Sequence, residues 1–306
     1  MSDSHVKGRR KSRVSKPAAI KMGKYLLPSN IAIPALMGLL FIIIAVAAAF
    51  EKGFDALVLR LTGFVLFAGL AYGVRSGLKV MGIYARLIDA FAVLFTITLL
   101  WSGAEYLHLY DPSAATAASL VFIALLNIVA TAVLIAVLLF IEKDRPSTLF
   151  IKAGQLTSGL TIGVPALLAG LLLTAALAYL FFNVGSAEPS KLLTVFSMLA
   201  LFSIAAGLAG EILFRGLFLS RLLPMAGKQA GLVIQAVLFA FFNGGLYYLL
   251  TSNLLYAGGV LVASAVLGYA LAYVTVKENS IVAAALSGIG ASMVLALPLF
   301  AAFIVA

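Results

Sequence analysis

The sequence QAGLVIQAVLFAFFNGGLYYLLTSNLLYAGGVLVASAVLGYALAYVTV, residues 229–276, contains no charged side chain over 48 residues. As one helix it would be ~72 Å long, more than twice the ~30 Å thickness of a hydrocarbon core. The stretch therefore predicts two membrane-spanning helices that fold back on each other. The polar tripeptide Thr251-Ser252-Asn253 is the predicted turn between them.

The rest of the chain has the same character. Of 306 residues 63% are hydrophobic and only 10% are charged, a composition that no soluble domain has. The sequence therefore predicts an all-α polytopic membrane bundle of about nine transmembrane helices, with eight as the alternative count. The seven further spans are predicted at 31–50, 56–74, 87–104, 112–141, 153–187, 192–210 and 279–306.

Basic residues orient the predicted bundle, because Lys and Arg accumulate on cytoplasmic loops. With the N-terminus inside, 18 of the 21 Lys and Arg residues lie on the cytoplasmic side, and only Lys52, Arg60 and Lys191 lie outside. One span more or fewer would destroy this division. We therefore expect an odd number of spans, a cytoplasmic N-terminus and an external C-terminus, in the cytoplasmic membrane. An aromatic belt is predicted at the outer interface, at Trp101, Tyr106, Tyr110, Tyr247, Tyr248 and Tyr256.

The chain is divided by composition into three parts. Residues 1–24 are predicted to be a basic, disordered cytoplasmic tail, residues 25–187 the N-terminal transmembrane helices, and residues 188–306 a C-terminal transmembrane bundle. The tail is expected to bind anionic inner-leaflet lipids rather than nucleic acid, at ~1 kcal/mol per basic residue near the surface. Its lipid-binding residues are predicted to be Arg9, Arg10, Lys11, Arg13 and Lys16.

Cysteine is absent, and the two histidines, His5 and His108, lie outside the predicted spans. Disulfides, thiolate ligands and cysteine nucleophiles are thereby excluded. Histidine is also absent from the predicted spans, so no histidine base operates there. We expect neither a metal site nor a cofactor.

Residues 210–216, Gly-Glu-Ile-Leu-Phe-Arg-Gly, place an ionisable pair at membrane depth. Such residues are expensive in the bilayer and indicate a functional site by default. Glu211 and Arg215 are spaced i, i+4 and share one helix face. The alternative interpretation is a structural salt bridge. A local ion pair is also predicted between Arg86 and Asp89.

The segment Glu-Ile-Leu-Phe-Arg-Gly-Leu-Phe-Leu resembles the first motif of the CPBP family, the CAAX prenyl proteases and bacteriocin-processing, Abi-like intramembrane proteases. In that family the motif reads Glu-Glu-x-x-x-Arg, and two further motifs carry His and Asn. Phe239 and Asn243 stand at the positions of the second motif, and Gly288 and Ser292 at those of the third. The resemblance covers about a third of the chain, and it implies a membrane-embedded protease that activates water with a glutamate.

Four positions depart from the family pattern. The water-activating glutamate is replaced by Gly210, the histidine of the second motif by Asn243, and the His and Asn of the third by Gly288 and Ser292. Glycine has no side chain to move a proton, and an asparagine is no base near neutral pH. Small residues also let membrane helices approach closely, so these positions are suited to closing a catalytic cavity.

Three hypotheses follow for the function. The first is a CPBP-like protein without catalytic activity that acts as a scaffold, regulator or binding partner of another membrane or envelope protein. The alternative is an active intramembrane endopeptidase that uses Glu211. The third, a small-solute transporter, predicts ionisable residues along a path and repeated halves, and few such residues and no repeat are present.

Overall fold

A computed structural model describes residues 19–22, 25–51, 53–77, 84–107, 116–152, 156–182, 184 and 187–305. The predicted lipid-binding residues of the tail, Arg9 to Lys16, lie outside these described residues, as do His108 and Lys52.

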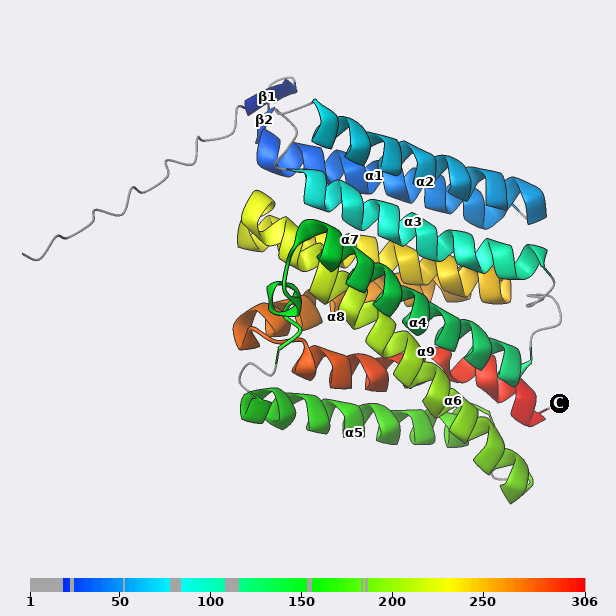
Figure 1. The fold of residues 1–306 in the computed structure, drawn as a ribbon. Coiled ribbons are helices and arrows are strands. Elements are labelled where there is room, and N and C mark those ends of the chain that lie inside the picture. Colours follow the sequence, from blue (N-terminus) through cyan, green and yellow to red (C-terminus); the bar gives the residue numbers. More distant parts are fainter. Residues whose placement is uncertain are drawn as a thin grey trace, which may run out of the picture.

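The predicted all-α bundle is confirmed (Figure 1), and a short antiparallel hairpin of β1 (Ala19–Met22) and β2 (Tyr25–Pro28) precedes it. A one-turn 3-10 helix, η3 (Pro146–Leu149), and a π-helix, η5 (Glu211–Phe218), complete the described elements. The α-helices are α1 (Ser29–Phe50), α2 (Gly53–Ser76), α3 (Ala85–Tyr106), α4 (Ala117–Glu142), α5 (Leu156–Phe181), α6 (Pro189–Gly210), α7 (Leu219–Thr251), α8 (Leu254–Glu278) and α9 (Val282–Val305).

Eight helices of the described chain are long and apolar enough to cross a membrane. One of them, Pro189–Thr251, has 63 residues and joins α6, η5 and α7. It is broken at Gly227, whose φ of 77° and ψ of 174° lie in a region that glycine adopts without steric cost. Figure 1 shows the chain reversing its direction within the element labelled α7, so this segment passes through the bundle twice. Eight helices with one reversal give nine passes among the described residues, and α1 begins and α9 ends at opposite ends of the bundle.

The predicted turn between the last long pair of spans is confirmed. The helix α7 ends at Thr251 and α8 begins at Leu254. Ser252 takes a left-handed conformation with φ of 50°, and the side chain of Asn253 accepts a hydrogen bond from the backbone N–H of Tyr256 at 3.0 Å. This cap satisfies one of the unpaired N–H groups at the start of α8.

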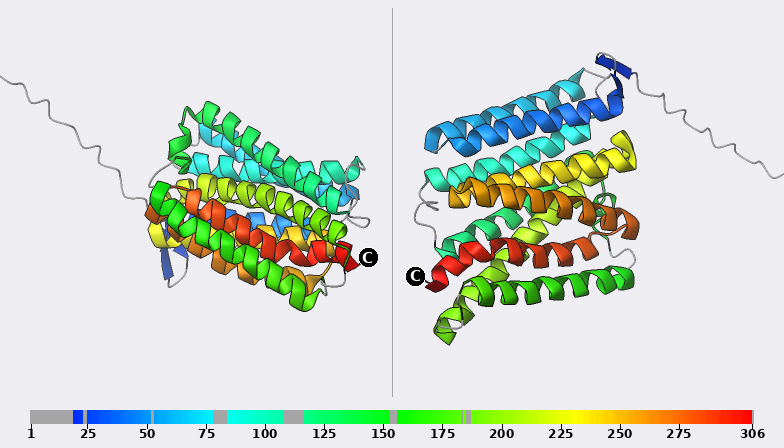
Figure 2. Two further views of the ribbon diagram at one scale, coloured as in Figure 1. Left: turned by 90° about the horizontal axis from the view of Figure 1, so that it is seen from below. Right: turned by 180° about the vertical axis from the view of Figure 1, so that it is seen from behind.

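Aromatic side chains join the first three helices to the rest of the bundle. The ring of Phe91 in α3 lies 5.0 Å from that of Phe67 in α2 and 5.1 Å from that of Phe218 at the end of η5. The helix α7 packs against both α1 and α8, while α9 packs against α5 and α6 (Figure 2). The N-terminal and C-terminal helices therefore share one hydrophobic core.

The predicted ion pair between Arg86 and Asp89 is wrong. Asp89 instead pairs with Arg75 across the α2–α3 interface at 2.5 Å, and Arg86 reaches Asp144 after α4 at 3.1 Å. Asp89 is buried, so its carboxylate faces the neighbouring helix, whereas Arg86 points outward from the first turn of α3. Both contacts tie helix ends together at the end of the bundle where α1 begins.

Candidate functional site

Glu211 and Arg215 lie inside the bundle on the π-helix η5, between α6 and α7. Glu211 is 1% exposed and Arg215 is 0% exposed. A π-helix is rare and occurs mostly as a single turn within an α-helix, frequently at functional sites. The wider turn places the Nη1 atom of Arg215 3.0 Å from the Oε1 atom of Glu211, so the predicted pair is formed within one element.

Two further groups hold the guanidinium of Arg215. Its Nη2 donates to the carbonyl oxygen of Gly268 in α8 at 3.4 Å, and its Cζ lies 4.0 Å from the centre of the Phe239 ring in α7. Gly268 permits this approach, because a Cβ at that position would lie 3.1 Å from the Cα of Ala236 and from the Phe239 ring. Arg215 is therefore clamped between a carboxylate, a carbonyl and an aromatic face.

One of the two oxygen atoms of the Glu211 carboxylate has no partner in this arrangement. Its Oε2 atom is buried and has no hydrogen-bond partner among the described residues. The N–H groups on Nη1 and Nε of Arg215 are likewise not directed at an acceptor there, so attraction between charges rather than an aligned hydrogen bond joins the pair. A buried charge pair with unmade hydrogen bonds is a weak source of stability, since desolvation offsets the Coulomb attraction.

Six of the seven motif positions lie around one small cavity, and Arg215 is not on its wall. The space of about 60 Å³ is enclosed by α4, α6, η5, α7, α8 and α9. A cavity of this size has room for a few water molecules and is far below the ~300–1,000 Å³ of pockets that take small molecules. The motif positions on its wall are Gly210, Glu211, Phe239, Asn243, Gly288 and Ser292.

Gly288 at a motif position and Gly207 of α6 let the helices lie close to the carboxylate. A Cβ at position 288 would lie 2.8 Å from Oε1 of Glu211, and a Cβ on Gly207 of α6 would lie 3.0 Å from the Cα of Ile289. These distances are shorter than a relaxed Cβ contact. The predicted close approach of helices is therefore present where α6 and η5 meet α9, and it leaves Glu211 only a narrow space.

The asparagine side chains on this wall are not bases, so they cannot take the role of the family's histidines. The Nδ2 atom of Asn243 donates to the carbonyl oxygen of Phe239 one turn earlier at 3.0 Å, which orients the amide along its own helix. Asn127 of α4 also lines the cavity, and its Oδ1 accepts from Thr131 in the same helix at 3.5 Å. Glu211 remains the one carboxylate on the wall, and general-base catalysis needs such a group within hydrogen-bond reach of the attacking water.

The fold and the site together define a class, a polytopic helical membrane protein with a buried Glu–Arg pair at the centre of its C-terminal helices. Residues 191–294 match the family model of type II CAAX prenyl endopeptidase Rce1-like proteins. This match confirms the resemblance to the CPBP family and covers about the same third of the chain. Comparison with curated proteins and with solved structures found no match.

Two contacts of Arg215 could not be predicted from the sequence. Gly268, whose carbonyl accepts from Arg215, belongs to the uncharged run of α8 and differs in no visible way from the other glycines there. Phe239 was placed by its motif position, but its role as the aromatic face under the guanidinium depends on the crossing of α7 with η5. Neither role has a signal in the sequence alone.

Proposed function

We propose that this integral membrane protein is a CAAX-protease-like scaffold that binds another membrane or envelope protein and does not cleave it. The observation that carries the proposal is the composition of the cavity wall. Gly210, Asn243, Gly288 and Ser292 occupy the positions of the family's water-activating and orienting groups, and the retained Glu211 is paired with Arg215. Water activation by this wall would depend on one carboxylate alone.

The size of the cavity supports a role without cleavage. Pockets that take small molecules usually measure ~300–1,000 Å³, several times the about 60 Å³ found here. A peptide would reach Glu211 only if α9 moved away from α6 and η5, and α6 and α9 approach each other closely at Gly207. The buried pair then serves to fix the crossing of α7 and α8 through Phe239 and Gly268.

The membrane and the partner belong to the same proposal. The 18 to 3 division of basic residues supports a cytoplasmic N-terminus and a location in the cytoplasmic membrane. Residues 188–306 are the CPBP-like part. The helices α1–α3 pack on one side of it through the shared aromatic core, and α5 packs on α9 at the other side (Figure 1). The basic tail adds attraction to anionic lipid of the inner leaflet.

Native co-purification in mild detergent tests the proposal, with the wild type compared with Glu211→Gln and mass spectrometry of the bound proteins. The matched control is Glu188→Gln, which alters an exposed carboxylate before α6. We expect one partner in stoichiometric amount, held equally by all three forms and of full length in cells that contain the wild type.

The alternative, an active endopeptidase, is favoured by the unpartnered Oε2 of Glu211 on the cavity wall. It predicts a different result in the same experiment. A protein that accumulates only on Glu211→Gln, and that is found as a shortened product with the wild type and with Glu188→Gln, is a trapped substrate. That outcome would overturn the scaffold proposal.

A further inference from the structure

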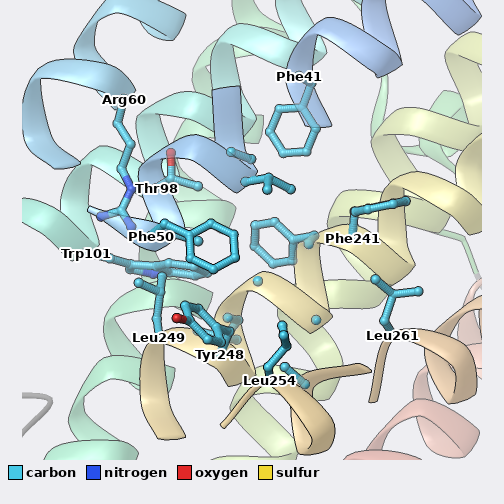
Figure 3. A pocket seen from close by; sticks show the side chains of 18 of the residues that line it. Phe41, Phe50, Arg60, Thr98, Trp101, Phe241, Tyr248, Leu249, Leu254 and Leu261 are labelled. Atoms are coloured by element: carbon cyan, nitrogen blue, oxygen red, sulfur yellow. The ribbon is translucent and has the colours of Figure 1, made fainter. Parts of the chain in front are cut away.

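A second and larger cavity lies near the end of the bundle opposite to the start of α1. It measures about 230 Å³ and is lined by the last turns of α1 and α7, the first turns of α8, the later part of α3 and a single residue of α2. Figure 3 shows aromatic rings on most of its walls, among them Phe41, Phe50, Phe241 and Tyr248. The rims of α1 and α8 include the exposed apolar side chains of Phe50 and Leu254, so the cavity opens toward lipid.

The residue of α2 is Arg60, a buried cation in an otherwise apolar wall. It is 4% exposed and lies seven residues after the start of α2, ~10 Å into the helix at 1.5 Å per residue. Its Nη1 donates to the hydroxyl of Ser102. Glu105 attracts it from a distance, but no carboxylate of the described residues forms an ion pair with it within 4.0 Å. Apart from Ser102, no described residue is found to accept a hydrogen bond from this guanidinium, so its remaining N–H groups can bind an anion.

Trp101 supplies a second donor at the same wall. It is 8% exposed, and its Nε1–H is buried without a hydrogen-bond partner among the described residues. In Figure 3 the side chain of Arg60 points down toward the indole, with Tyr248 and Phe50 beyond it. Trp101 therefore does not face lipid in the predicted outer aromatic belt but lines an internal wall. A buried unpaired donor beside a buried cation indicates a ligand that carries an acceptor with negative charge.

We propose that this cavity, lined by Arg60, Trp101 and Phe50 among others, binds one acyl chain of an anionic phospholipid, with the phosphate of that lipid near Arg60. Charge complementarity and the two donors select the head group, and the aromatic lining selects the chain. The volume of about 230 Å³ is below that of a typical small-molecule pocket, which fits a segment of one chain rather than a whole compact ligand. The depth of Arg60 fits a phosphate held just below the membrane interface.

Fluorescence quenching by brominated lipid tests this site directly, because Trp101 is the one tryptophan in the chain. The full-length protein is reconstituted in vesicles with equal fractions of brominated phosphatidylglycerol or brominated phosphatidylcholine, with the bromine atoms near the head-group end of the chain. We expect the anionic lipid to be preferred at Trp101 by about tenfold, which equals about 1.4 kcal/mol. Arg60→Met removes this preference, and Arg60→Lys retains part of it.

Two adjacent glycines provide a matched pair of variants for the chain-binding part. Gly258 and Gly259 both lie in α8, both are exposed, and a Cβ on either meets no atom within 4 Å, but only Gly258 lines the cavity. We expect Gly258→Leu to reduce quenching by both brominated lipids at least twofold, and Gly259→Leu to leave it unchanged.

Equal quenching by the anionic and zwitterionic lipids in the wild type would overturn the proposal, as would equal effects of the two leucine substitutions. Because the readout is the occupancy beside Trp101, it is independent of whether the protein cleaves or binds another protein at Glu211. Failure of this site and failure of the proposed scaffold function are thus distinguishable.

Discussion

Replacing Arg215 with methionine measures what the buried pair contributes to stability. Removal of one partner of a buried ion pair costs about 3–5 kcal/mol, because the other charge is left unpaired in the interior. Arg215 also lies 4.0 Å from the centre of the Phe239 ring, a contact worth about 2 kcal/mol when water is excluded. We therefore expect Arg215→Met to cost about 5 kcal/mol. Glu211→Gln keeps a carbonyl oxygen close to the guanidinium and should cost about 3 kcal/mol, the lower end of the same range.

The double variant Glu211→Gln/Arg215→Met separates the pair from its surroundings. Replacing a whole buried pair with neutral groups of similar volume is often close to neutral, so the double variant should lose less than the sum of the single variants. We expect a coupling energy of about 2–3 kcal/mol. The measurement is equilibrium unfolding in mixed detergent micelles, followed by Trp101 fluorescence, with Glu188→Gln as the exposed control. Additive single effects, with a coupling below about 0.5 kcal/mol, would refute the idea that the two residues act as one unit.

Two other contacts give predictions for the same unfolding assay. Gly170→Ala should destabilise the protein by about 1–3 kcal/mol, since its Cβ would lie 2.6 Å from the backbone of Gly290 and must push α5 away from α9. The control is Gly69→Ala, whose Cβ meets no atom within 4 Å and which should be neutral or slightly stabilising. Equal effects of the two substitutions on stability would contradict the close crossing of α5 and α9. Arg221→Met should cost about 3–5 kcal/mol because Arg221 is buried between Glu142 and Asp144. Arg86→Met, whose side chain is 53% exposed, should cost below about 1 kcal/mol, and a similar loss in both would show that burial does not set the value of these pairs.

The membrane spans could be predicted closely because charge and polarity mark their ends. The predicted span 31–50 corresponds to α1 (Ser29–Phe50), and the span 192–210 ends at the same residue as α6 (Pro189–Gly210). Lipid excludes charged residues and unpaired backbone groups, so a single physical rule sets the length and the position of each helix. The same rule says little about which helices pack together.

Contacts between helices could not be predicted from the sequence, because they depend on how each helix is rotated about its axis and on the angle at which two helices cross. Arg75 and Arg86 are both possible partners of Asp89 from the sequence, and only the packing of α2 on α3 selects Arg75. The cavity beside Arg60 likewise exists because α1 and α8 both pack on α7 and leave a gap that small residues do not fill. No local pattern in the sequence records either outcome.

Gly288 shows how the motif departures act together rather than as separate losses. The Oε1 atom of Glu211 is held 3.0 Å from Arg215, and a Cβ at position 288 would lie 2.8 Å from that same oxygen. A side chain at 288, such as the histidine of the family motif, would therefore require the end of the Glu211 side chain to shift. Glycine at 288 leaves room for the carboxylate where it lies now, and we expect Gly288→His to move Glu211 relative to Arg215. Gly288 and the pairing of Glu211 are thus coupled through one contact, which agrees with the proposed role of this wall in packing rather than in cleavage.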